Sequence, residues 1–236
     1  MSDSKSPKLV IFNQAANYLT VGLANEFAKK NEKVVLITGS VHVQGEELDQ
    51  RVSIDPILSW QEEHGLSKAM NYLRALTSIY FKLLFKYRRH EVFFISVPPM
   101  GYLLNILLPN RFSMLIWDVY PDILKITGMK ESHPVYRIWS KLNIISFKKA
   151  YKLFTISDGM ADSLSQYIDR GKIIVRPIWS IFQENTRIDR RKNKFAIENG
   201  LEGKFVVQYS GNIGLTHKVE LMVALAEKME SYPDIL

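Results

Sequence analysis

Seven short apolar runs, rich in β-branched or aromatic residues, constrain the fold of this chain more than any other feature. They are LVIF, VVLI, VFFISV, MLIW, LFTI, IIV and FVV. Most are continuous instead of alternating with polar residues, as in strands buried on both faces of a parallel sheet. Because helical patterns lie between several of these runs, the sequence predicts an α/β fold with a Rossmann-like, doubly wound parallel sheet and right-handed crossovers.

The pattern breaks once, which predicts a domain boundary. After KIIVRPIWSIF the chain is polar and strongly charged until a new apolar run begins at Phe205. Long joins without structure are unusual inside one compact domain. We therefore predict a first domain at 1–186, a basic linker at 187–202 and, at 203–236, one strand followed by a helix over 216–230. Ile235 and Leu236 look like the beginning of the next strand. With no complete sheet around it, we expect the strand at 205–209 to dock on the first domain, self-associate or fray.

Composition limits the classes of function. The 236 residues are 47% apolar and contain no cysteine, which rules out disulfides and thiolate metal sites and suits a reducing compartment. No run of 18 apolar residues occurs, so we expect a cytoplasmic chain without a membrane span. The 31 Lys and Arg against 24 Asp and Glu favour acidic partners such as nucleotides or anionic lipids. No sequence motif of nucleic-acid-binding proteins accompanies the basic clusters, and we predict no nucleic-acid partner.

The segment YSGNIGLTHK follows the last apolar run and opens a helix. Gly211 and Gly214 allow a sharp turn whose amides could contact a phosphate, with Asn212 as a further donor and Lys218 as positive charge. The same two glycines also suit a simple tight turn. The dinucleotide motif G-x-G-x-x-G is missing, which argues against an NAD-dependent enzyme.

The loop after the first apolar run lies at the carboxyl edge of the predicted sheet, where α/β proteins bind ligands. Its polar side chains are Asn13, Gln14, Asn17, Tyr18 and Thr20. They offer donors and acceptors without a glycine pair, which suits a hydroxyl-bearing ligand better than a pyrophosphate. The alternative is that Thr20 only caps the helix that follows.

The stretch MLIWDVYPDILKITG places two carboxylates at the end of a predicted strand. Asp118 lies at the carboxyl edge and Asp122 follows four residues later. A carboxylate beside aromatic rings loses hydration, which raises its pKa and fits it to accept a proton. Equally, Asp122 could cap a short helix and Asp118 could bond only to loop amides.

A helix predicted over 71–89 carries two aromatic residues that do not fit its core stripe. The predicted stripe is Leu73, Leu76, Tyr80, Leu83, Leu84 and Tyr87. At about 100° per residue, Phe81 and Phe85 point away from it. The cations beside them are Arg74, Lys82, Arg88 and Arg89. Exposed rings among cations suit the surface of an anionic membrane, whereas a neighbouring element that covers both rings would remove this function.

Taken in order, five segments resemble the family-4 glycosyltransferases with the GT-B architecture. The segments are NQAANYLTVGLANEFAKKNEKVVLITG, IWDVYPDILKITG, FTISDGMADSLSQY, IIVRPIWS and FVVQYSGNIG. The chain looks most like the members that build bacterial capsule, exopolysaccharide or O-antigen of lipopolysaccharide. The resemblance runs along essentially the whole chain, and its most specific parts are DVYPDILKITG and the spaced pair SDGMADSL and YSGNIG.

This resemblance implies the N-terminal half of a GT-B fold, followed by an incomplete second Rossmann-like domain that would bind the donor. It implies a hexosyltransferase that moves a sugar from a nucleoside diphosphate sugar to a hydroxyl of a lipid-linked saccharide, with retention and without a metal or other cofactor. Such a protein would be cytoplasmic and peripheral on the inner face of the membrane. Because the acidic E-x7-E motif of the family is not found after Phe205, we expect the 236 residues to be an inactive fragment.

The resemblance also implies roles for individual residues. Asn212, Gly214 and Lys218 match positions near the donor diphosphate, and Asp118 matches the polar group near the acceptor hydroxyl. The loop 13–20 would line the acceptor side, although the glycine pair common in the family is missing there.

A hypothesis from another class also accounts for the sequence. A Rossmann-like domain could bind a nucleotide or a partner chain without catalysis, since half of an active site cannot stabilise a transition state. A reading frame that continues past Leu236 into an E-x7-E segment would favour the enzyme.

Overall fold

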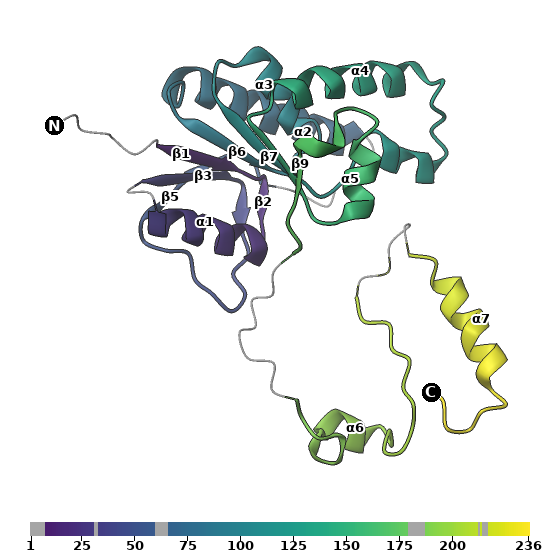
Figure 1. The fold of residues 1–236 in the computed structure, drawn as a ribbon. Coiled ribbons are helices and arrows are strands. Elements are labelled where there is room, and N and C mark those ends of the chain that lie inside the picture. Colours follow the sequence, from purple (N-terminus) through teal and green to yellow (C-terminus); the bar gives the residue numbers. More distant parts are fainter. Residues whose placement is uncertain (1–7, 31–32, 60–65, 179–186, 212, 214–216) are drawn as a thin grey trace. The chain divides into compact units, whose positions relative to one another are not determined.

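The computed structural model describes residues 8–30, 33–59, 66–178, 187–211, 213 and 217–236. The chain divides into two compact units, Met1–Ile181 and Phe182–Leu236. Figure 1 traces both units along the sequence.

The first unit is built on a seven-stranded sheet of order β5-β3-β1-β6-β7-β8-β9, in which every neighbouring pair is parallel. Its strands are β1 (Leu9–Phe12), β3 (Val34–Thr38), β5 (Val52–Pro56), β6 (Glu91–Ile95), β7 (Phe112–Ile116), β8 (Lys152–Thr155) and β9 (Ile173–Val175). A small second sheet pairs β2 (Ala15–Ala16) with β4 (Ser40–Val41). Six of the seven apolar runs form strands of the main sheet, which confirms the predicted Rossmann-like α/β fold.

Helices cover both faces of the sheet (Figure 1). They are α1 (Tyr18–Lys30), α2 (Leu66–Phe81), α3 (Leu104–Leu107), α4 (Pro134–Lys149) and α5 (Asp158–Leu164). Shorter turns are η1 (Lys82–Lys86), η2 (Gly101–Leu103), η3 (Asp122–Thr127) and η4 (Arg170–Lys172). Ala24 and Ala28 of α1 pack into one apolar cluster, and residues of α2, α4 and α5 pack into the other. Thus α1 lies on one face of the sheet and the remaining long helices lie on the opposite face.

The predicted helix over 71–89 differs from the observed one in its core stripe and its end. Leu73 is 57% exposed, so its assignment to the core was wrong, whereas the predicted Leu83 and Tyr87 are buried, together with Ala75 and Ile79. The helix changes at Lys82 into a single π turn, closed by the Tyr87 amide donating to the Lys82 carbonyl at 2.9 Å. The π turn contains one more residue than an α-helical turn, which rotates the residues after Lys82 about the helix axis. The prediction assumed regular α-helical spacing to residue 89.

The second unit contains η5 (Arg190–Lys192), α6 (Lys194–Glu198) and α7 (Val219–Met229). Phe205 forms a parallel bridge with Ile235, supported by the Phe205 amide donating to the Asp234 carbonyl at 2.7 Å. The strand start predicted at Ile235 is therefore confirmed, whereas the run at 205–209 forms a single bridge and not the predicted five-residue strand. Among the described residues of this unit only Ala196 is buried, and apolar side chains line an open groove of about 480 Å³ between α7 and the bridge.

Candidate functional site

The loop after β1 uses most of its polar groups to hold its own shape. Asn13 Nδ2 donates to Thr20 Oγ1 at 3.1 Å, and Asn13 Oδ1 accepts from the Ala15 amide at 2.9 Å. The side chain of Asn17 accepts from the Thr20 amide at 3.1 Å and so caps α1. The cap is therefore Asn17, and the alternative prediction that Thr20 caps this helix was wrong. Asn13 and Thr20 are buried, and Asn17 and Tyr18 are partly exposed.

Gln14 joins the loops that follow several strands. Its amide donates to the Val97 carbonyl at 3.0 Å, and its carbonyl accepts from the Gly39 amide at 3.0 Å. Its side-chain Nε2 donates to Leu58 O at 3.2 Å and to Asn71 Oδ1 at 2.8 Å. The side chain is fully buried. Gln14 therefore positions the carboxyl edge of the sheet from inside, and its role in contacting an acceptor stays a prediction.

The loop after β6 contains backbone strain that the sequence analysis missed. Ser96 and Met100 have positive φ angles of 43° and 69°, which non-glycine residues rarely adopt. Ser96 Oγ accepts from the Trp117 amide at 2.9 Å and so connects the end of β6 to the end of β7. Strained residues concentrate at functional sites. The consecutive Pro98 and Pro99 were the sequence signal for an unusual loop here.

Asp118 lies at this edge, immediately beyond β7. Asp118 as a whole is exposed to solvent. The surrounding protein nevertheless removes part of the hydration of its carboxylate and so raises the pKa of this group. Burial also raises the pKa of Tyr120, with a further contribution from the charge of Asp118. The pKa of Tyr72 on α2 is raised by burial and then by Tyr120. In the described part of the chain, no side chain bonds or pairs with the Asp118 carboxylate, so it can accept a proton or a hydrogen bond.

Asp122, the second predicted catalytic carboxylate, is held by four donors. Tyr136 and Lys125 contact Oδ1 at 2.7 and 2.9 Å, and Tyr167 and Gln166 contact Oδ2 at 2.5 and 3.1 Å. Burial alone would raise the pKa of Asp122, but the hydrogen bonds from Tyr167 and Tyr136 and the contact with Lys125 outweigh it and lower the pKa. The carboxylate therefore stays ionised and ties η3 to α4 and to the turn after α5.

The predicted diphosphate residues are only partly described. Gly211 and Lys218 are exposed residues of the second unit, and Asn212 and Gly214 lie outside the described residues. The helix α7 begins at Val219 with Lys218 as its N-cap, three residues later than predicted, and the Lys218 side chain makes no capping bond.

The membrane-surface residues of the prediction fall into two groups. Phe81 and Phe85 are 50% and 75% exposed, so no described element covers them. Lys82 differs, because it pairs with Asp55 on the edge strand β5. Lys86 pairs with the same carboxylate at 2.9 Å. Lys82 thus shares the single negative charge of Asp55 with Lys86. Arg74, Arg88 and Arg89 are exposed. None of the described helices combines the length and the apolar character that crossing a bilayer requires.

Comparisons with known proteins identify the fold. No protein-family model matches the chain, and no curated protein matches it. Among solved structures, Glycyrrhiza uralensis UGT73P12 complexed with glycyrrhetinic acid 3-O-monoglucuronide superposes with a TM-score of 0.50 at 14% identity, over 94% of this chain and 60% of that one. Phytolacca americana UGT2 complexed with UDP-2fluoro-glucose and pterostilbene gives a TM-score of 0.49 at 12% identity, over 96% and 65%.

The chain therefore spans 60 to 65% of the length of these two solved structures. A superposition at 14% identity with a TM-score of 0.50 shows a common fold and nothing finer. Together with the seven-stranded parallel sheet, it shows that this chain has the Rossmann-like α/β fold of GT-B glycosyltransferase structures.

Proposed function

We propose that this chain belongs to a glycosyltransferase that transfers a hexose from a nucleoside diphosphate sugar to a hydroxyl of a saccharide. The observation that carries the proposal is Asp118: a carboxylate with a raised pKa and no described partner, at the carboxyl edge of a GT-B-like sheet. Ligands of open α/β sheets bind at this edge, near the point where the strand order reverses. Here that point lies between β1 and β6, and β7 with Asp118 is the next strand.

In the proposed reaction, the acceptor oxygen forms a bond to the anomeric carbon while the bond from that carbon to the diphosphate breaks. Asp118 accepts a hydrogen bond from the acceptor hydroxyl and increases the electron density on its oxygen. The hydroxyl proton leaves with the diphosphate, and the configuration at the anomeric carbon is retained. From the resemblance we propose that the diphosphate of the donor binds at Gly211, Asn212, Gly214 and Lys218, and that the charge of Lys218 stabilises the leaving group.

We propose a lipid-linked saccharide of surface polysaccharide synthesis as the acceptor class. The resemblance of the segments around Asp118 and Gly211 supports this class, as do the exposed Phe81 and Phe85. An acceptor held in a membrane requires an enzyme that works at the surface of that membrane.

A transfer assay tests the proposal. The 236-residue chain and any longer product of the same reading frame are incubated with a panel of nucleoside diphosphate sugars and a membrane extract, and transfer and hydrolysis are measured. We expect transfer by the longer protein, little by the chain alone, and loss of transfer in Asp118→Asn.

The matched control is Asp162→Asn, whose carboxylate is 74% exposed and pairs with Arg170 on the surface. It removes the same charge without touching the proposed site, so transfer should persist. Nucleotide binding without turnover in any form of the protein would refute the enzyme and favour a binding module.

A further inference from the structure

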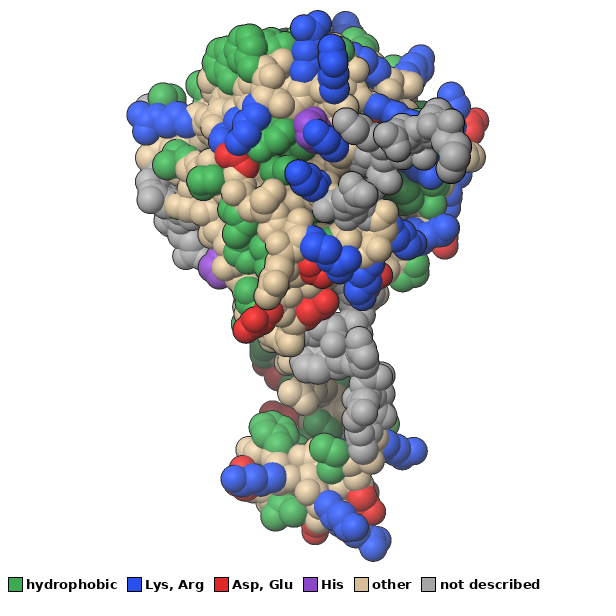
Figure 2. Space-filling model, turned by 90° about the vertical axis from the view of Figure 1, so that its left-hand side faces the viewer, with side chains coloured by type: hydrophobic (Ala, Val, Ile, Leu, Met, Phe, Trp, Pro, Cys, Tyr) green, Lys and Arg blue, Asp and Glu red, His purple; other side chains and the backbone are tan. Residues whose placement is uncertain are grey.

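The edge of the main sheet at which its strands begin, named the amino edge, carries a row of cations. Six of the seven strands begin with a Lys or Arg or directly after one, namely Lys8, Lys33, Arg51, Arg111, Lys152 and Lys172. Because all the strands are parallel, these residues lie along one edge, opposite to the edge that holds Asp118. Figure 2 views the molecule from the side where β1 begins, and Lys and Arg predominate over the upper part of the first unit. The row gives this edge a potential that attracts anions.

A pocket of about 310 Å³ lies at the amino edge, where α4 ends and β8 begins. Its buried lining is apolar and consists of Phe147, Leu153 and Ile168, which are 2%, 2% and 8% exposed. Its exposed lining is polar and consists of Lys148, Tyr151 and Lys172. Sites for small molecules usually combine an apolar lining with a few polar groups, in cavities from about 300 Å³ upwards. The pocket therefore has the size and the lining of a site for a small ligand.

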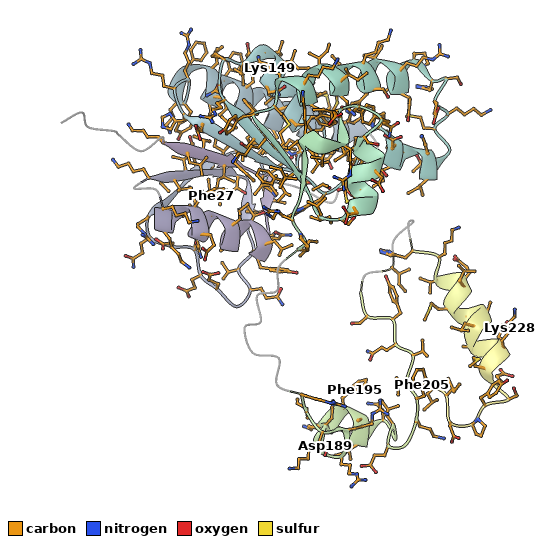
Figure 3. The ribbon with its side chains drawn as sticks, in the orientation of Figure 1. Phe27, Lys149, Asp189, Phe195, Phe205 and Lys228 are labelled. Carbon is orange, nitrogen blue, oxygen red and sulfur yellow. The ribbon has the colours of Figure 1, made fainter. Side chains whose placement is uncertain are left out.

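The two lysines of the pocket are available to a ligand. Lys148 and Lys172 are exposed, and neither forms an ion pair within the described part of the chain. Lys149, which Figure 3 labels at the end of α4, differs, because its ammonium group donates to the carbonyls of Ile106 and Leu108 at 3.3 and 3.1 Å. Lys149 thus stabilises the fold, whereas Lys148 and Lys172 offer two uncompensated charges at one cavity.

The acidic residues near the pocket are engaged elsewhere. Asp169, next to Ile168, accepts a hydrogen bond from the Gly171 amide at 2.9 Å and so caps η4. Glu91 pairs with Arg111 at 3.0 Å. No Asp or Glu is found among the described residues that line the pocket. The positive potential of its two lysines is therefore not cancelled locally.

Tyr151 provides a further donor at the pocket. The guanidinium carbon of Arg111 lies 3.2 Å from the centre of the Tyr151 ring, and the ammonium group of Lys152 lies 5.6 Å from it. Contacts of cations with an aromatic ring are attractive, so they hold this ring in place although the residue is 50% exposed. The phenol hydroxyl of a ring held in this way can donate a hydrogen bond to an anion.

We propose that this cavity, named the amino-edge pocket, binds a small organic phosphate. The phosphate contacts Lys148, Lys172 and the hydroxyl of Tyr151, and the carbon part of the ligand packs on the three buried apolar side chains. Two ammonium groups match the charge of a phosphate dianion, and ammonium groups are common ligands of phosphate. The inference does not rest on the proposed transfer reaction, because the pocket lies at the opposite edge of the sheet from Asp118.

Both parts of the lining are needed to choose this class of ligand. A bare inorganic anion would satisfy the lysines but leave the apolar lining in contact with water. A neutral aromatic molecule would cover the apolar lining but leave both charges without a partner. An organic phosphate satisfies both, so it should bind more tightly than either of its parts alone.

Nuclear magnetic resonance of the full chain, with labelled Leu and Ile methyl groups, tests the proposal. The probes are phenyl phosphate, inorganic phosphate and phenol at low salt and about pH 7.5, where a phosphate ester carries nearly two negative charges. We expect phenyl phosphate to shift the methyl signals of Leu153 and Ile168 in a saturable way. Its affinity should exceed that of inorganic phosphate and that of phenol by about tenfold or more, because each of these lacks one of the two contacts.

Substitutions at the mouth of the pocket test the role of charge. Lys148→Gln and Lys172→Gln should each weaken the binding of phenyl phosphate by about tenfold, because each removes one charged contact. The matched control is Lys141→Gln, which removes the same charge from an exposed position of α4 outside the pocket. It should bind as the unchanged chain does. All three side chains are exposed, and circular dichroism verifies that each variant is folded.

Two results would overturn the proposal. One is unchanged affinity for phenyl phosphate in the protein that carries both Lys148→Gln and Lys172→Gln. The other is a titration in which the signals of Leu153 and Ile168 do not move, including one in which phosphate shifts only signals near residues 211–218. Transfer activity plays no part in this assay, so its outcome is separate from that of the proposed function.

Discussion

Replacement of Asp122 by asparagine tests whether this carboxylate is structural. Asparagine has nearly the same shape but no charge, and it offers one acceptor oxygen where the carboxylate offers two. The hydroxyls of Tyr136 and Tyr167 both donate to Asp122, and Lys125 pairs with it at 2.9 Å. In the variant one tyrosine faces an amide donor, and Lys125 loses one of its two carboxylate partners while it keeps Glu131 at 2.6 Å.

The size of the effect follows from the number of charged hydrogen bonds. Each bond to an ionised group contributes about 1.5 to 3 kcal/mol, and a buried donor without a partner costs more. The Asp122 side chain is 16% exposed, so hydrogen bonds to water replace part of the stabilisation that is lost in the variant. We expect Asp122→Asn to lower the free energy of unfolding by about 3 kcal/mol. For a unit the size of Met1–Ile181, this corresponds to a fall in Tm of about 6 to 12 °C.

Protonation should remove the difference between the two proteins. The folded-state pKa of Asp122 lies below its unfolded value of about 3.9, so its contribution is complete above that pH and is lost as the pH falls through the folded pKa. The gap between wild type and variant should therefore be full at neutral pH and shrink below about pH 4. Tryptophan fluorescence during urea or thermal unfolding measures it, because all four tryptophans lie within residues 1–181.

Two results would refute this reasoning. A change in the free energy of unfolding no larger than that of Asp162→Asn, a surface pair for which about 0.5 kcal/mol is expected, would show that the four contacts are not stabilising. Loss of sugar transfer in Asp122→Asn at unchanged stability would return this residue to a catalytic role.

Three further predictions concern the carboxyl edge of the sheet. Asn17→Ala removes the cap of α1 and should cost about 1 kcal/mol in urea unfolding. Gln14→Ala removes both bonds of a buried side chain and leaves a cavity, so the same measurement should show a loss of about 2 kcal/mol or more. Asp118→Asn should leave the stability unchanged or slightly higher at pH 7, because burial disfavours the charged form, and thermal scans should show this advantage vanish below the unfolded pKa of about 3.9.

The sequence alone predicted those strands of the sheet that are buried on both faces, because such strands appear in it as continuous apolar runs. Continuous apolar runs such as LVIF and MLIW form most of the central strands β1 and β7, because side chains on both faces of such strands are covered by helices. The edge strand Val52–Pro56 was missed. Only Val52 and Asp55 of its five residues are buried, so it carries no apolar run, and its buried Asp55 reads as a surface residue.

The roles of the polar residues were decided by tertiary structure. The position of Asp118 at a strand end was predictable from the run that precedes it, but its partial burial and the lack of a bonding partner among the described residues were not. Asp122 receives its bonds from Tyr136 and Tyr167, which are 14 and 45 residues away, and Gln14 binds Asn71 across 57 residues. Hydrophobic periodicity records whether a position is buried. Which donor meets which acceptor depends on the order of strands in the sheet, and only the folded chain defines that order.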